Sequence, residues 1–350
     1  MPNSRDYAIV AGVAEYGALP KRKLKGPPND VAHIADWLVD PLGGDVPAAN
    51  VKMLWANPPP LPPGNGYPTP ADQPKFDSIY LTLFNLIEDL EAADTRGRRI
   101  YVFLAGHGES VARARTDAVM LAKDWTQKLQ GRGISGAALL DYIRYKQAFE
   151  EVILIMDCCR NENVALLAPS GPPWGAIDAY PFPEPNWMFV RAARPKEPAY
   201  EEPFPTPTSP NVFGILTRAA LDALLHYRPN GDLTAQAFRN YVYNRVEQIA
   251  ESRKRIQRAD IEICPGADNM SIVSGNNAEA DVRVEFSNGP QAARQIEVGI
   301  DTITLRTIPA DGALLAIKLP IGHKYWLRVV GDPKRRIVNL LDPGGQDERF

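Results

Sequence analysis

The sequence predicts an α/β fold with a mostly parallel sheet flanked by helices, followed by a small antiparallel β domain. Continuous apolar runs rich in β-branched and aromatic residues indicate strands that are buried on both faces of a sheet. These runs lie at 7–13, 51–55, 100–104, 152–156 and 187–190. Helical periodicity fills the intervals at 30–38, 76–90 and 134–145, and continues at about 211–227 and 233–256 before a short strand at 259–264. Alternating strands and helices favour parallel pairing.

The pattern changes near residue 275. Beyond 278, helical periodicity disappears and apolar and polar residues alternate, as in half-buried strands. Such segments lie at 281–286, 296–305, 314–319 and 325–330. We therefore expect two domains, a large α/β domain over 1–275 and a β domain over 276–350.

Composition excludes several classes of protein. The chain has 39 Lys and Arg against 42 Asp and Glu, a net charge of −3, so a basic surface for nucleic acid or an anionic membrane is not expected. Three cysteines, two of them adjacent, do not form a disulfide framework. The amino-terminal apolar run is too short for a signal peptide. These features predict a cytoplasmic protein.

Prolines gather in two stretches, 58–74 and 169–210. Proline suits neither helix interiors nor central strands, so both stretches are predicted to be long connections. The second follows the strand that ends in Asp157, and long connections in compact domains are often functional. We expect the segment 161–210 to be a loop that gates the end of that strand.

Reactive side chains follow two of the predicted strands. His107 stands between Gly106 and Gly108 after one strand, and Cys158 and Cys159 follow the next strand of this kind. In open α/β sheets, ligands bind beyond the carboxyl ends of strands. A Cys beside a His suits acyl transfer, because imidazole can deprotonate the thiol and then protonate the leaving amine.

Structural explanations for these residues remain open. Cys159 could be a buried structural thiol, and Cys158 should point to the opposite face of its strand. Asp157 could be a partner at the sheet end. Asp30, in the Asn-Asp pair that starts the helix at 30–38, could be a plain N-cap.

Several blocks resemble the caspase-like cysteine peptidases, in particular the bacterial and metacaspase-type branch. They are YAIVAGVAEY with LKGPPNDVAHIADWL, YVFLAGHG, VILIMDCCRN, and AARPKEPAYEE followed by GILTRAALDAL. The blocks cover about residues 5 to 275 in the order of the family. His107 and Cys159 are separated by 52 residues, close to the roughly 50 expected of caspases.

The resemblance implies roles for individual residues. His107 would be the general base and Cys159 the nucleophile, with the amides of Gly108 and Cys159 forming the oxyanion hole. Asp157 and Asp30 would line a pocket for a basic P1 residue, the substrate residue before the cleaved bond. Two carboxylates in a partly buried pocket favour a long cation and reject an acidic side chain.

The sequence departs from the family in places that bear on activation. Pro27 stands where metacaspases have a Cys, and Arg160-Asn161-Glu162 replaces their His-Ser-Gly. No acidic calcium cluster is evident around 117–124, so calcium dependence is left open. No zinc motif or phosphate-binding loop occurs in the sequence, so no cofactor is expected to be required.

We therefore expect a cysteine endopeptidase that acts on protein or peptide substrates after Arg or Lys. Self-cleavage is expected within 161–210, where Arg191, Arg194 and Lys196 lie, or at Arg160 just before it. The alternative is a catalytically silent caspase-fold scaffold that binds partners. The β domain could bind a regulatory ligand or partner in either case.

Overall fold

The computed structural model describes most of the chain. In the amino-terminal three quarters it describes residues 3–19, 23–55, 73–111, 114–163, 182–204, 211–228 and 232–273. Beyond these it describes 279–285, 294–300, 303–310, 314–320, 323–332, 334–340 and 346–349. The chain divides into two compact units: Met1–Phe204 with Asn211–Ser274, and Gly275–Phe350 with Pro205–Pro210.

The first unit contains a six-stranded sheet with the strand order β13-β9-β7-β3-β1-β2. Its strands are β1 (Asp6–Gly12), β2 (Val51–Trp55), β3 (Gly97–Ala105), β7 (Phe149–Asp157), β9 (Asn186–Arg191) and β13 (Asp260–Ile263). All neighbours pair parallel except β13, which runs antiparallel to β9 at one edge. The mostly parallel sheet expected from the apolar runs is confirmed.

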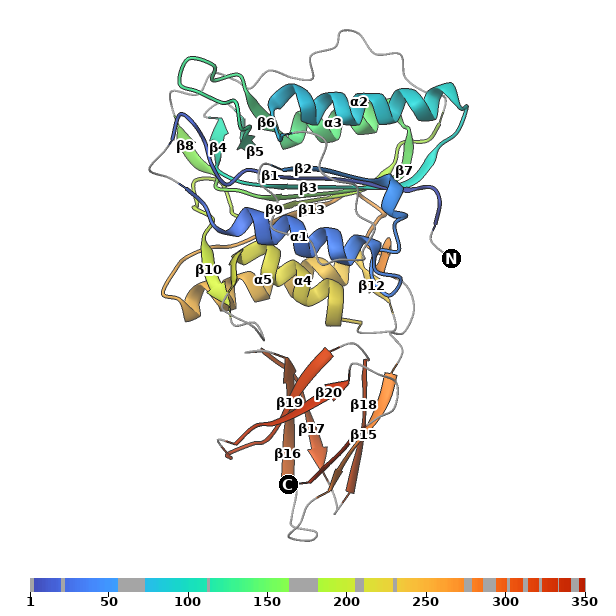
Figure 1. The fold of residues 1–350 in the computed structure, drawn as a ribbon, viewed down its shortest axis with the longest axis vertical. Coiled ribbons are helices and arrows are strands. Elements are labelled where there is room, and N and C mark those ends of the chain that lie inside the picture. The colour runs from blue at the N-terminus through green and yellow to red at the C-terminus, as the bar shows by residue number, and fades with distance from the viewer. Residues whose placement is uncertain are drawn as a thin grey trace. The chain divides into compact units, whose positions relative to one another are not determined.

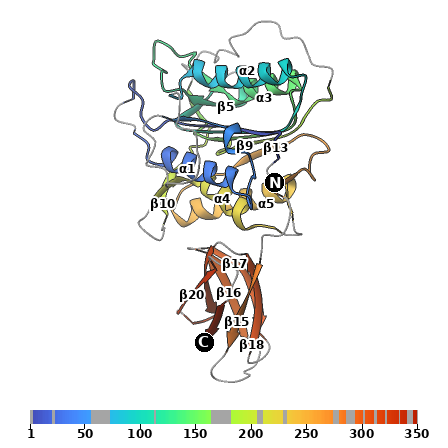
Figure 2. The same cartoon turned by 45° about the vertical axis from the view of Figure 1, so that its right-hand side comes forward.

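Among the described residues, five α-helices cover the two faces of this sheet. They are α1 (Gly26–Val39), α2 (Phe76–Ala92), α3 (Gly136–Lys146), α4 (Ile215–His226) and α5 (Ala235–Ser252). Figures 1 and 2 show α2 and α3 on one face and α1, α4 and α5 on the other. A short 3-10 turn, η1 (Ala48–Asn50), precedes β2. None of the described helices is long and apolar enough to cross a membrane.

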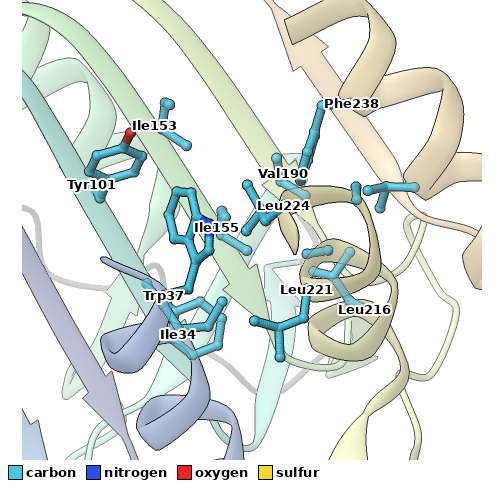
Figure 3. Packing of buried hydrophobic residues seen from close by; sticks show 14 of the residues in the cluster. Ile34, Trp37, Tyr101, Ile153, Ile155, Val190, Leu216, Leu221, Leu224 and Phe238 are labelled. Atoms are coloured by element: carbon cyan, nitrogen blue, oxygen red, sulfur yellow. The ribbon is translucent and has the colours of Figure 1, made fainter. Parts of the chain in front are cut away.

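The strands separate two hydrophobic cores. In β3, Tyr101 and Phe103 belong to the core under α1, α4 and α5, whereas Val102 and Leu104 belong to the core under α2 and α3. Successive side chains of a strand point to opposite faces, so an uninterrupted apolar run fills both cores. Figure 3 shows part of the first core, with Trp37 of α1 and Ile155 of the sheet among its buried side chains.

A second sheet of the same unit continues the chain beyond the carboxyl ends of β3 and β7. Its order is β6-β5-β4-β8, formed by β4 (Gly108–Val111), β5 (Ala114–Leu121), β6 (Gly133–Ser135) and β8 (Asn161–Asn163). Two short pairs complete the unit: β10 (Glu201–Phe204) with β11 (Asn211–Gly214), and β12 (Leu233–Thr234) with β14 (Ser271–Val273).

The structure corrects three expectations. The helix α1 begins at Gly26 rather than after Asp30, because Pro27 fits the first turn, where it removes no helical hydrogen bond. Residues 211–214 form strand β11 rather than helix. The segment 161–210 is not one loop around the expected strand at 187–190, which is β9, because it also supplies β8 and β10. The prolines of 58–70 and those of 169–181 lie outside the described residues.

Two of the arginines expected as self-cleavage sites are buried. The side chain of Arg160 is 0% exposed and donates to Asp260 at 2.5 Å and to the Ala193 carbonyl at 3.0 Å. Arg191, in β9, donates to the same carboxylate at 3.0 Å. This ion-paired cluster ties the segment after Cys159 to the edge of the central sheet.

The second unit contains two facing sheets, one of order β18-β15-β21 and one of order β17-β16-β19-β20. The strands are β15 (Glu279–Glu285), β16 (Arg294–Ile300), β17 (Ile303–Ala310), β18 (Leu314–Pro320), β19 (His323–Val329), β20 (Arg336–Leu340) and β21 (Gln346–Arg349). The described pairs are antiparallel except β15 with β21, which is parallel. Buried side chains from both sheets, such as Val282 and Leu327, form one core.

Candidate active site

Strand register places Cys159 opposite His107. Ala105, the last residue of β3, pairs with Asp157, the last residue of β7. After His107 and Cys159, Glu109 of β4 pairs with Asn161 of β8, also in parallel. The same offset therefore holds on both sides of the pair, and neighbouring strands lie only about 4.8 Å apart.

Both residues line one pocket. This pocket has a volume of about 200 Å³ and opens at the carboxyl ends of the central strands. Its described lining consists of Leu24, Pro27, Asp30, Gly106, His107, Asp157, Cys158, Cys159, Ala199, Tyr200, Glu201 and Gly214. The five residues predicted from the sequence thus fall in or next to a single cavity, since Gly108 adjoins His107.

The thiol of Cys159 is held by the backbone of Ala199. The Sγ–H group donates to the Ala199 carbonyl at 3.2 Å, and the Ala199 N–H donates to Sγ at 3.3 Å. Burial raises the pKa of the Cys159 thiol, and the charge of Asp157 acts in the same direction, whereas the Ala199 N–H lowers it. In this environment the neutral thiol is favoured, so a base must remove its proton before it can attack.

His107 is half-buried, and its ring lies against a tyrosine. The imidazole and the ring of Tyr16 have centroids 5.1 Å apart and are tilted by 43°. The backbone N–H of His107 donates to the Tyr16 hydroxyl at 2.9 Å. Its carbonyl accepts from the N–H of Leu121 at 2.8 Å.

Close packing explains the glycine after His107. A Cβ atom on Gly108 would lie 2.7 Å from both Sγ of Cys158 and the Cys159 carbonyl oxygen. Cys158 is 2% exposed and belongs to the core under α2 and α3. Burial raises the pKa of its thiol well above the ordinary value, so Cys158 is an inert core residue.

Three carboxylates also line the pocket. Asp30 and Asp157 are 2% and 7% exposed, and Glu201 of β10 joins them. Asp157 accepts from the Thr217 N–H at 2.9 Å and from its hydroxyl at 2.6 Å. Asp30 accepts from the N–H of Gly214 at 3.0 Å.

The crowding of like charges perturbs these groups. Burial raises the pKa of Asp157 to about 6, and Glu201 acts in the same direction against the two hydrogen bonds from Thr217. Burial also raises the pKa of Asp30 well above its ordinary value, and the charges of Asp157 and Glu201 add to this. The described lining contains no Lys or Arg. A cation bound in the pocket would therefore offset the repulsion between these carboxylates and favour their ionised forms.

Sequence reasoning missed Glu201. Its carboxylate accepts from the backbone N–H groups of Lys25 at 2.8 Å and Gly26 at 2.7 Å, and so caps α1 from a distant strand. This capping leaves Asp30, which lies just beyond the first turn of α1, free to face the pocket rather than to cap the helix. The AYEE block already marked the segment in the sequence, but only the tertiary structure shows which of its two glutamates faces the pocket.

The described residues contain no group of three or more His, Cys, Asp or Glu side chains arranged to hold a metal ion.

Comparisons with known proteins identify the family. The family model described as "Caspase domain" matches residues 5–274. The chain therefore belongs to the caspase-domain family, as the sequence blocks suggested, and this membership supports a peptidase.

Individual proteins that resemble this chain share little sequence identity with it. A protein named "probable protease" from a Desulfuromonadales bacterium is 23% identical over 218 residues, which are 60% of this chain and 23% of that protein. The chain thus matches about a quarter of the length of this curated relative. A crystal structure of a Geobacter sulfurreducens protein is 11% identical over 78% of this chain and 99% of that one, with a TM-score of 0.45.

Proposed function

We propose that this protein is a cysteine endopeptidase that uses His107 and Cys159 and cleaves after Arg or Lys. The observation that carries the proposal is the pocket itself, in which a thiol and an imidazole at opposed strand ends face three carboxylates. The two parts of the pocket have different proposed roles. The strand ends supply the chemistry, and the carboxylates select the substrate.

The reaction follows from these groups. His107 accepts the Sγ proton as Sγ of Cys159 forms a bond to the scissile carbonyl carbon. The N–H groups of Gly108 and Cys159 then stabilise the oxyanion. His107 returns the proton to the leaving amine as the C–N bond breaks, and water hydrolyses the resulting thioester with His107 as base. Sγ must first leave its hydrogen bonds with Ala199, so substrate binding and thiol release are linked.

Electrostatics favour a basic P1 side chain. Two buried carboxylates with raised pKa values, Asp30 and Asp157, pay a desolvation cost that a bound guanidinium or ammonium group would offset. Glu201 adds a third acceptor, which suits the several donors of a guanidinium. An acidic P1 residue would be repelled by these carboxylates.

Self-cleavage is proposed at a narrower set of positions than the sequence suggested. Between Cys159 and residue 210, the only basic residues in the sequence are Arg160, Arg191, Arg194 and Lys196. The first two are buried, and the guanidinium of Arg194 donates to the Tyr243 hydroxyl. Lys196 is exposed and is therefore the preferred site. The gating role of 161–210 and a regulatory role of the second unit stay predictions.

Cleavage of fluorogenic peptides with Arg, Lys or Asp at P1 tests the proposal, with and without calcium. Wild type, Cys159→Ala and a matched control, Cys264→Ala, are compared. Cleavage after Arg or Lys that is lost only in Cys159→Ala is the expected result. Cleavage after Asp would leave the proposed roles of His107 and Cys159 intact but refute the proposal that the carboxylates select a basic P1 residue.

A thiol-directed covalent probe separates a latent enzyme from the scaffold alternative. Selective labelling of Cys159 over Cys158 and Cys264, dependent on His107, indicates an enzyme that requires a trigger. Absence of both cleavage and selective labelling would favour the catalytically silent scaffold.

A further inference from the structure

A buried tyrosine hydroxyl is inserted between two backbone segments at His107. Tyr16 follows β1 and is 3% exposed. Its hydroxyl accepts from the His107 N–H at 2.9 Å and donates to the Leu121 carbonyl at 3.2 Å. Leu121 in turn donates its N–H to the His107 carbonyl at 2.8 Å. Both backbone polar groups of His107 are thus fixed by one closed set of three hydrogen bonds.

The position of this hydroxyl is unusual within the strand pairing. β4 and β5 pair antiparallel with Gly108 opposite Met120, so His107 stands opposite Leu121 one step earlier. In a hydrogen-bonded antiparallel pair, the two residues exchange both N–H···O bonds directly. Here one bond is direct and the other passes through the Tyr16 hydroxyl. The hydroxyl therefore acts as a wedge that holds the two segments apart at His107.

The residues around the Tyr16 hydroxyl explain why it affects the position of His107. His107 lies between two glycines, whose backbones have wide conformational freedom, so its position must be fixed by partners outside the chain segment. Gly106 is itself required by the wedge, because a Cβ atom there would lie 2.5 Å from the Tyr16 hydroxyl oxygen. Burial raises the pKa of Tyr16, so the hydroxyl keeps the proton that it donates to Leu121.

We propose that Tyr16 is a positioning residue for the imidazole of His107, acting through its hydroxyl wedge and its ring contact. The inference rests on the proposed function, because it presumes that His107 is the base. Without the hydroxyl, the His107 N–H and the Leu121 carbonyl either stay unpaired or close directly on each other. Either change moves the imidazole relative to Cys159, and a displacement of about 1 Å can lower the rate about 100-fold.

Tyr16→Phe, which removes only the hydroxyl, tests the proposal. The matched control is Tyr101→Phe, because Tyr101 is 5% exposed and its hydroxyl accepts from Arg99 at 2.8 Å, away from the pocket. We expect Tyr16→Phe to lower kcat about 10- to 100-fold with KM changed less than about threefold. The rate of Cys159 alkylation against pH should shift toward the profile of His107→Ala. Tyr101→Phe should retain the wild-type kcat and alkylation profile.

Other outcomes separate this inference from the proposed function. If alkylation of Cys159 in the wild type is already independent of His107, the proposed pair fails and the positioning role fails with it. If the pair holds and Tyr16→Phe matches the wild type, only the wedge is refuted. An equal loss of kcat in Tyr101→Phe would also refute the wedge, since the loss would then reflect a general disturbance of packing. Should Tyr16→Phe not fold, Gly106→Ala displaces the same hydroxyl, and wild-type kcat in that variant would overturn the inference.

Discussion

Replacing Asp157 by Asn should stabilise the protein and weaken its capture of basic substrates. Both Thr217 donors converge on one carboxylate oxygen, Oδ2, at 2.9 and 2.6 Å. An Asn side chain can place its carbonyl oxygen there and keep both hydrogen bonds. Its amide group then takes the place of the other carboxylate oxygen, beside Asp30 and Glu201, where a donor is better tolerated than a negative charge.

The magnitude follows from the pKa of Asp157. Folding raises this pKa from 3.8 to about 6, so between these values the native state holds more protons than the unfolded state. The free energy of unfolding therefore falls as the pH rises through this window. About two pKa units at 1.36 kcal/mol each correspond to about 3 kcal/mol lost above pH 6, and none below pH 3.8. Asp157→Asn should recover up to that amount at neutral pH.

Urea unfolding of both proteins between about pH 4 and pH 8 measures this effect. The difference in the free energy of unfolding should be small at the acid end and grow to about 1–3 kcal/mol in favour of Asp157→Asn. The matched control is Asp222→Asn. Asp222 is equally buried but ion-paired with Arg218 at 3.0 Å and Arg245 at 3.1 Å, so the same substitution should destabilise there. A pH-independent difference, or a loss of stability in Asp157→Asn, would refute the reasoning.

Three further predictions concern the site and its support. The ratio of kcat/KM for an Arg substrate to kcat/KM for a substrate with an uncharged P1 residue should rise between about pH 5 and pH 7 as Asp157 ionises, and a ratio that rises equally in Asp157→Asn would contradict the assignment. Gly108→Ala should lower kcat more than about 100-fold, because the added methyl group collides with Cys158. A wild-type kcat for this variant in steady-state kinetics would show that the close packing at Gly108 is not required. Asp260→Asn should cost about 3 kcal/mol in urea unfolding, because it removes the shared partner of the buried Arg160, and a loss below about 1 kcal/mol would show that Ala193 and other acceptors suffice.

The parts of the fold that sequence reasoning predicted are those determined by local pattern. β3 and β7 were recognisable because strands buried on both faces are apolar throughout. The placement of His107 and Cys159 followed from the general position of ligands at strand ends. Their opposition is now explained by register, since the pairs Ala105–Asp157 and Glu109–Asn161 have the same offset.

The parts that sequence reasoning missed depend on contacts between distant segments. The start of α1 was expected at the Asn29-Asp30 pair rather than at Gly26, because the group that caps this helix, Glu201, lies more than 170 residues away in the sequence. Residues 211–214 are a strand because they pair with β10, and the short run before α4 shows no sign of that partner in its own pattern. The buried cluster of Arg160 and Arg191 could not be distinguished from accessible cleavage sites, because its partner Asp260 belongs to the edge strand β13.

The separation of 52 residues between His107 and Cys159 has no chemical meaning of its own. β5, β6 and α3 lie between the two residues, and added residues in their connections would change the number without moving the pair. What fixes the geometry is that the chain is paired on both sides of each residue, by β3 with β7 before and β4 with β8 after. Two glycines allow the chain to pass between these pairings, Gly106 beside the Tyr16 hydroxyl and Gly108 against Cys158. The Gly-His-Gly motif therefore reflects a packing requirement on both sides of His107.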